Sequence, residues 1–187
     1  MKVKNIIKKS AEFLRLENVV RYLNDQMEIT SEIDQEIKDF LIAINMVNNN
    51  IASSYLELID VVEIVNRKGE ISFNDISQNP IIEIKNVCDF AGNDISYKLL
   101  STGLKVSEVE HIKITYSYFP QEVGVDDDID YYLKINDLVF AIGVVGEYLY
   151  IKGAIDEASI WDKRFKQTMF NLIRPKRNIV IPTKRWE

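Results

Sequence analysis

The first 55 residues place apolar side chains at helical spacing. Over residues 5–24 these positions recur every three or four residues among lysine, arginine and glutamate, which predicts one amphipathic helix. Thr30 and Ser31 then precede several acidic residues, a pattern typical of a helix start. A second, long helix is predicted from there to about Tyr55, with its core face at Ile33, Ile37, Leu41, Ile44, Val47 and Ile51.

From residue 57 the spacing changes to the alternation of strands. Short alternating segments are separated by turn sequences at residues 66–69 (NRKG), 91–94 (AGND) and 101–103 (STG). The clearest segment is HIKITYSY, at residues 111–118, which alternates until Pro120. Because turns recur at this short interval, we expect an antiparallel meander of about five or six strands.

Helical spacing returns in the last third of the chain. Three aspartates at 126–128 are expected to open an unusually apolar helix that continues to about Leu149. Gly153 interrupts it, and a final amphipathic helix follows, ending before Pro175. The last ten residues, 178–187, are expected to be extended.

This order of elements predicts an α+β protein. The length of 187 residues fits one domain or one domain with an insertion, and 47% hydrophobic residues is ordinary for a globular chain. The simplest arrangement is a helical domain of residues 1–56 and 121–187, resembling a four-helix bundle with two N-terminal and two C-terminal helices. An antiparallel β module of residues 57–120 is then inserted and projects from it.

The net charge of −6 is unevenly distributed. Residues 1–24 and 156–187 each carry +4, so the segment between them carries −14. Patches of opposite charge suit contacts within the molecule or between copies, and the alternative is charge that only keeps the surface solvated. The acidic total argues against a general nucleic-acid binder.

Neither a membrane span nor a secretory signal is expected. The longest apolar run, residues 138–146, is about half the length of a membrane-spanning helix. The basic start of the chain leads into no continuous apolar segment, which argues against a signal peptide. The single cysteine, Cys88, fits a reducing compartment. We therefore expect a soluble protein that is made in the cytoplasm and has no membrane contact.

Few residues suggest chemistry. His111 is the one histidine, and no serine or cysteine is placed by a motif to act as its nucleophile. Cys88 is interpreted as a small buried residue of a strand. Aspartates at 126–130 suit Ca²⁺ or Mg²⁺, but the spacing of a calcium loop is missing, so helix capping is the favoured interpretation. We expect a protein that is not an enzyme and has no cofactor, metal or small-molecule substrate.

Two glycines and a glutamate stand out in the apolar helix. Gly143 and Gly146 lack the preceding strand and the spacing of a phosphate-binding loop, so we interpret them as points where a neighbouring helix approaches closely. Glu147 needs a partner in such surroundings, which a lysine or arginine of the final helix would supply. The alternative for Glu147 is a wet groove.

The C-terminal part combines basic and aromatic side chains. Such residues can clamp nucleic acid or anchor a protein interface. The alternative is that the final helix packs its aromatic residues inward while the tail is solvated. A tryptophan so close to the end favours docking, and we expect the interface to include Trp161, Arg164, Arg177, Lys184, Arg185 and Trp186.

Several short segments, in this order, resemble a family of small virion proteins encoded by prophages of low-GC bacteria. That family is regarded as head–tail connectors or adaptors of tailed phages. The likeness covers roughly residues 30–187 and excludes the first helix. The segments are NNNIASSY (48–55), GEISF (69–73), NPIIEI (79–84), ITYSYFP (114–120), AIGVVGEY (141–148), GAIDEA (153–158) and RW (185–186).

The resemblance implies a noncatalytic component of the virion neck. Adaptors of this kind form rings on the portal and are built from helices with an inserted β module. It also implies a homo-oligomeric ring, portal or tail proteins as partners, and a location in the host cytoplasm during assembly. The alternative function is a regulatory or nucleic-acid-binding module that uses the basic tail, with nonspecific DNA contact.

Overall fold

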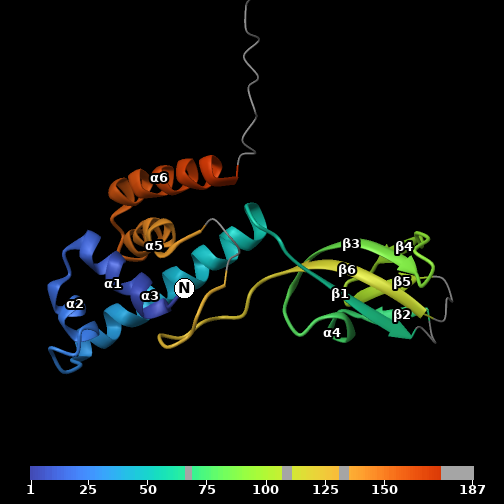
Figure 1. Ribbon diagram of the computed structural model, residues 1–187, viewed down its shortest axis with the longest axis horizontal. Helices are drawn as coiled ribbons and strands as arrows, with labels where there is room; N and C mark the ends of the chain where they lie inside the picture. The colour runs from blue at the N-terminus through green and yellow to red at the C-terminus, as the bar shows by residue number, and fades with distance from the viewer. Residues whose placement is uncertain (66–68, 107–110, 131–134, 174–187) are drawn as a thin grey trace, which may run out of the picture.

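The computed structural model describes residues 1–65, 69–106, 111–130 and 135–173. Most helices gather at one end of the molecule, and two small antiparallel sheets lie at the other together with one short helix (Figure 1). The α+β class predicted from the sequence is confirmed. Over the residues just given, no helix has the length and hydropathy to span a membrane.

The elements follow the order helices, strands, helices. The helices are α1 (Val3–Leu14), α2 (Glu17–Leu23), α3 (Ser31–Ser54), α4 (Phe73–Ile76), α5 (Asp137–Ile151) and α6 (Ile155–Ile173). The strands are β1 (Leu58–Val65), β2 (Glu70–Ser72), β3 (Ile81–Asp89), β4 (Tyr97–Leu99), β5 (Gly103–Val106) and β6 (His111–Tyr118).

The prediction of one continuous helix over residues 5–24 is wrong. The chain leaves α1 at Arg15, whose φ of 58° is left-handed, and starts α2 two residues later. Around this point the hydrogen bonds are those of a helix end, with the Leu16 amide donating to the Ala11 carbonyl at 2.9 Å. Because both helices share one period, the spacing of apolar residues does not reveal the break. The change of direction lets α2 bury Val19 in the same core as α1.

The start of α3 is confirmed, and the start expected for the apolar helix is wrong. The Thr30 hydroxyl accepts the Ile33 amide at 3.3 Å, as its position before α3 predicts. α5 is capped by Asn136, whose side chain accepts the Leu138 amide at 3.1 Å. The helix therefore begins about ten residues after the aspartates at 126–128, and the expected core position at residue 133 lies outside the described residues.

The aspartates at 126–128 connect the chain to the start of α1. Asp127 accepts the Gly124 amide through its side chain at 2.7 Å and the Val3 amide through its carbonyl at 3.0 Å. The Met1 ammonium group donates to the Ile129 carbonyl at 2.7 Å. A negatively charged loop suits this position because the first turn of α1 presents unpaired amides.

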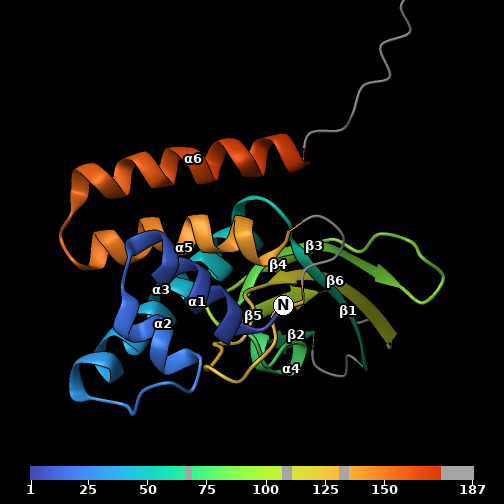
Figure 2. The same cartoon turned by 60° about the vertical axis from the view of Figure 1, so that its left-hand side comes forward.

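The helical end has one buried core, to which α1, α2, α3, α5 and α6 contribute. α5 is the most enclosed of them, since most of its residues are buried. α6 packs against α5 (Figure 2). The interpretation of the two glycines is confirmed, because a Cβ on Gly143 would lie 2.9 Å from the Phe165 ring, and one on Gly146 would lie 3.3 Å from the Asp162 amide nitrogen. The expected four-helix arrangement thus has five members, because the first predicted helix is two.

The prediction of a meander is wrong in its strand order. The strands form two antiparallel three-stranded sheets with the orders β1-β6-β3 and β2-β5-β4. The last strand of the module therefore lies between the first strand and β3. This order buries the inward-facing side of β6, since Ile112 faces Ile64 and Ile114 faces Val62 across the β1–β6 pair. Alternation shows which face a residue takes but does not identify the neighbouring strand.

A second buried core lies between the two sheets and is separate from the helical one. It contains Ile71, Ile76, Ile84, Val87, Leu104, Val106, Ile112, Ile114 and Tyr116. None of these residues belongs to the buried cluster of the helical end. The structure thus has two cores, one for the helices and one for the strands.

Candidate assembly surface

β1 lies at one side of its sheet, and β6 is the one strand that pairs with it in the described part of the chain. The backbone on the other side of β1 is therefore open over its eight residues. We call this open backbone, together with the outward-facing side chains next to it, the β1 edge. The outward-facing side chains are those of Ile59, Val61, Glu63 and Val65.

The β1 edge is apolar for an exposed strand. Ile59, Val61 and Val65 are 55%, 45% and 48% exposed, whereas Val62 and Ile64 face the core of the module. Soluble proteins usually cover, shorten or charge such an edge, because it can pair with any extended chain. The β1 edge therefore has the properties of a binding surface for an added strand.

The hydrogen bonds around β1 show which of its amides point outward. The Val61 amide donates to Oδ1 of the preceding residue, Asp60, at 2.7 Å. On the opposite side of the sheet, the Phe119 amide donates to the Pro80 carbonyl at 2.9 Å, so alternate amides of β6 face β3. Since amides alternate in direction along a strand, both contacts indicate that the amides of residues 59, 61, 63 and 65 point away from β6.

Carboxylates outnumber lysines around the β1 edge. Lys85 donates to Glu57 at 2.8 Å and also pairs with Glu83, and these two hydrogen bonds raise the pKa of its ammonium group. Lys113 lies 3.3 Å from Glu63. Asp60 accepts the Val61 amide instead, with the Tyr116 hydroxyl 3.5 Å from its second oxygen. The carboxylates on or directly before β1 are Glu57, Asp60 and Glu63, whereas Glu83 lies on β3, on the other side of β6. Lys85 and Lys113 pair with two of these three, so the described surroundings of β1 keep little net charge.

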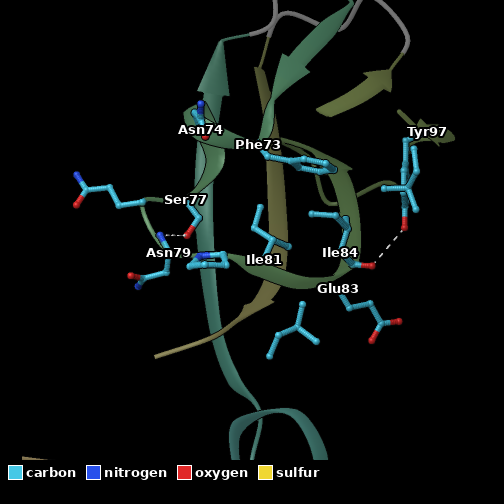
Figure 3. Close-up of a pocket in the computed structure, with 12 residues that line it drawn as sticks. Phe73, Asn74, Ser77, Asn79, Ile81, Glu83, Ile84 and Tyr97 are labelled. Atoms are coloured by element: carbon cyan, nitrogen blue, oxygen red, sulfur yellow. Dashed lines mark hydrogen bonds between the residues drawn. The ribbon is translucent and has the colours of Figure 1, made fainter. Parts of the chain in front are cut away.

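A groove of about 560 Å³ lies on the same module, between α4, β3 and β4. Figure 3 shows Phe73, Ile81 and Ile84 on one side and Tyr97 on the other, where the Tyr97 hydroxyl donates to the Ile84 carbonyl at 3.3 Å. Glu83 is the one charged side chain among those that line it. The groove is therefore mainly apolar, and it suits contact with a protein segment better than with a charged small molecule.

The residues predicted for an interface fall into two groups. Trp161 is half-buried, with its ring centroid 5.3 Å from that of Phe13, so it packs α6 onto α1. Arg164 is exposed and lies over the same indole, with its guanidinium carbon 5.2 Å from the ring. This geometry favours the alternative in which α6 packs Trp161 inward. Arg177, Lys184, Arg185 and Trp186 lie outside the described residues.

The other candidates for chemistry are dispersed. His111 begins β6 and is exposed, while Cys88 is half-buried in β3 with its sulfur 3.8 Å from the Lys113 carbonyl. Within residues 1–65, 69–106, 111–130 and 135–173, no histidine, cysteine and carboxylate side chains gather as a metal-binding group. The structure does not bring His111 and Cys88 together with the aspartates at 126–130.

Glu147 is half-buried on α5 and faces α6. Burial raises the pKa of its carboxyl, the nearby Asp162 carboxylate raises it further, and Lys166 opposes both. Lys166 is thus the basic neighbour expected from the final helix, although its ammonium group binds Asp162 at 2.7 Å. The basic partner expected for Glu147 is therefore Lys166, which also binds the carboxylate of Asp162.

Sequence reasoning missed a polar cluster between α3 and α5. The Lys152 ammonium group donates to Asp39 Oδ2 at 2.6 Å and to Glu36 Oε1 at 3.1 Å, and the Tyr148 hydroxyl donates to Glu36. Burial first, and then the Glu36 carboxylate, raise the pKa of the Tyr148 hydroxyl. The available signal was Asp39, a carboxylate beside the apolar Phe40 on the core side of the helix.

No protein-family model matches the chain, and no curated protein matches it. The function therefore has to be argued from the surfaces themselves.

Proposed function

We propose that this protein is a noncatalytic structural subunit of a phage or prophage virion, a head–tail connector or adaptor that assembles into a ring at the neck. The observation that carries the proposal is the β1 edge, an exposed strand with three apolar side chains on a module separate from the helical core. Such a surface supports association between proteins. The likeness of residues 30–187 to neck adaptors supplies the kind of assembly.

The charge distribution supports contact between copies. The C-terminal segment from residue 156 carries +4, while the β module contributes to the acidic middle of the chain. A basic end that meets an acidic module of the next copy gives the head-to-tail contact that closes a ring. Portal or tail proteins are then the further partners, first in the host cytoplasm and later at the virion neck.

Deletion of residues 178–187 tests the proposal. We expect the intact chain to form oligomers in native mass spectrometry and light scattering, and the shortened chain to be monomeric at the same concentration. Ile29→Ser is the control, because it removes an apolar side chain that is 52% exposed on the loop before α3 and should leave association unchanged. Equal association of the intact and shortened chains would contradict tail-dependent assembly.

A DNA-binding measurement separates this function from the regulatory alternative. A monomer that binds DNA through its basic tail should lose affinity steeply between low and moderate salt, because each neutralised phosphate releases counterions. For the structural subunit we expect oligomers that form without DNA. Salt-dependent DNA binding by a monomer that does not associate would replace the proposal with the alternative.

A further inference from the structure

The β1 edge is complementary to a second copy of itself when the two strands run antiparallel. We propose that β1 of one copy pairs with β1 of a second copy about a two-fold axis at Val62. In the described part of the chain β1 lies at the side of its sheet opposite β3 (Figure 1), so the pair joins two sheets into one with both β1 strands at its centre. The inference goes beyond the proposed function, because a two-fold pair closes on itself and requires neither the tail nor a ring.

The backbone of β1 restricts how a second copy can align. The amides of the odd-numbered residues from 59 to 65 point away from β6, so an added strand forms its hydrogen bonds at these positions. With the axis at Val62, residue 59 of one copy lies opposite residue 65 of the other. Residues 61 and 63 lie opposite each other in the same way. Every outward position of both strands is then in a hydrogen-bonded pair.

The side chains favour this alignment over its neighbours. The axis at Val62 places Ile59 against Val65 of the second copy, and both side chains are about half exposed in the single copy. An axis at Glu63 would place two like carboxylates directly opposite each other, which is destabilising. An axis at Val61 would place Ile59 opposite Glu63, so the apolar contact with Val65 would be lost. The alignment about Val62 therefore combines apolar contact with separated charges.

The charges along the strand are also self-complementary. Glu57 directly precedes β1, whereas Arg67 and Lys68 follow it in the sequence. Antiparallel pairing brings the acidic start of each strand towards the basic sequence that follows the other. Glu63, which is next to the axis on the outer face of the sheet, already has Lys113 of its own copy at 3.3 Å. A second copy of β1 is therefore not repelled by charge.

Asp60 occupies the edge in the single copy. Its Oδ1 accepts the Val61 amide at 2.7 Å, and in the pair this amide donates to a carbonyl of the second copy instead. The carboxylate must release the amide first, so Asp60 weakens the pair without preventing it. One strand from each copy also makes a smaller contact than a standard protein interface. We therefore expect pairing at higher protein concentrations than the tail-dependent assembly.

Disulfide formation between exposed positions tests the alignment. Full-length Ile59→Cys and Val65→Cys, each in a Cys88→Ser chain, are mixed and oxidised. We expect a linked pair with one copy of each variant, because the Cα atoms of hydrogen-bonded partners lie about 5.5 Å apart, within the range of a disulfide. All these substitutions are at positions that are at least partly exposed, so folding should be preserved.

The matched control mixes Ile59→Cys with Glu63→Cys in the same Cys88→Ser chain. Position 63 is two residues away from the one opposite Ile59, so the Cα atoms should lie beyond the disulfide limit of about 7 Å. Little linkage is expected in this mixture. Equal linkage in the two mixtures, or none in either, would overturn the pairing about Val62.

Asp60→Ala tests the competition for the Val61 amide. Added to both members of the first mixture, it should lower the protein concentration for half-maximal linkage about tenfold, as the loss of a competing charged hydrogen bond predicts. Glu28→Ala removes a carboxylate from the exposed loop before α3 and should leave that concentration unchanged. Equal effects of the two variants would contradict the role of Asp60 and the pairing at Val61.

The tail deletion separates this contact from the proposed function. Removal of residues 178–187 should leave linkage between positions 59 and 65 unchanged, because the tail takes no part in the pair. If the deletion abolishes assembly and no linkage forms in the intact chain, the β1 pair fails while the proposed function stands. If linkage forms and the deletion leaves assembly unchanged, the tail-dependent assembly fails while the β1 pair stands.

Discussion

Asp39 is a carboxylate on the core side of α3, with 8% of its surface exposed. Burial alone would raise the pKa of its carboxyl, but hydrogen bonds from Lys152 and Gln35 outweigh burial and hold the pKa below its usual value. Burial likewise would lower the pKa of Lys152, but its hydrogen bonds to Asp39 and Glu36 raise it. At the residue scale, this contact attaches the end of α5 to α3.

The direction of each shift gives a pH window for this contact. A carboxyl with a lowered folded pKa stabilises the protein above its unfolded pKa, and that contribution is lost as the pH falls through the folded value. A lysine with a raised folded pKa stabilises the protein below its unfolded pKa, and that contribution is lost as the pH rises through the folded value. The contact between Asp39 and Lys152 should therefore be complete near neutral pH and should weaken at both extremes.

Lys152→Met should lower the free energy of unfolding at pH 7 by about 1–3 kcal/mol, because a buried carboxylate loses its cation. Lys38→Met is the matched control, since Lys38 pairs with Asp34 at 2.6 Å on the exposed side of α3. That variant should lose no more than about 0.5 kcal/mol. Urea unfolding measures both. The difference should shrink in acid, where Asp39 is protonated, and equal losses at pH 7 would contradict the argument.

At the scale of elements, Gly143 allows α5 to pack closely between α3 and α6, because it has no side chain. A Cβ on Gly143 would lie 2.9 Å from the Phe165 ring of α6 and 3.1 Å from Val47 Cγ1 of α3. Both distances are shorter than ordinary carbon contacts. The close approach of the three helices therefore depends on glycine at this position.

Gly143→Ala should destabilise the protein by about 1 kcal/mol or more. A helical glycine replaced by alanine ordinarily gains about 0.5–1 kcal/mol, but overpacking a core costs about 1–3 kcal/mol. Gly124→Ala is the control, because its Cβ would meet only Asp127 Oδ2, at 3.5 Å. Its effect should stay within about 0.5 kcal/mol. Thermal or urea unfolding decides the sign, and a stabilised Gly143→Ala variant would show that the helices separate easily.

At the scale of the whole molecule, the described residues form two cores that share no buried residue. Ile44 of α3 and Ile114 of β6 are both fully buried, one in each core. Truncation of either side chain leaves a cavity in its own core and leaves the other core packed. The two ends of the molecule should therefore respond separately to such changes.

Ile44→Ala and Ile114→Ala should each cost about 2–5 kcal/mol in the core that holds the side chain. Native-state hydrogen exchange should show faster exchange in α3 and α5 for the first variant, and in β3 and β6 for the second. Each variant serves as the control for the other. Faster exchange throughout the chain in both variants would show that the two cores unfold as one cooperative unit.

The repeat of apolar residues determines most of the elements of this protein. Spacing identifies α3, α5 and α6, and Thr30 marks the start of α3 because a hydroxyl there satisfies a free amide. Gly143 is recognisable as a contact between helices because it interrupts an apolar helix with the smallest residue. These features depend on neighbours along the chain, and they can be predicted from sequence.

The tertiary structure alone decides which distant segments meet. The candidate site shows the difference: the alternation of β1 is visible in the sequence, whereas its pairing with β6, the last strand of the module, is decided by the fold. In the same way Asp39 finds its cation 113 positions away, at Lys152. The spacing of apolar residues indicates which face of a helix or strand is buried. Long-range packing decides which other segment covers that face. The elements thus follow from local sequence, and the order of the strands follows from how they pair over long distances.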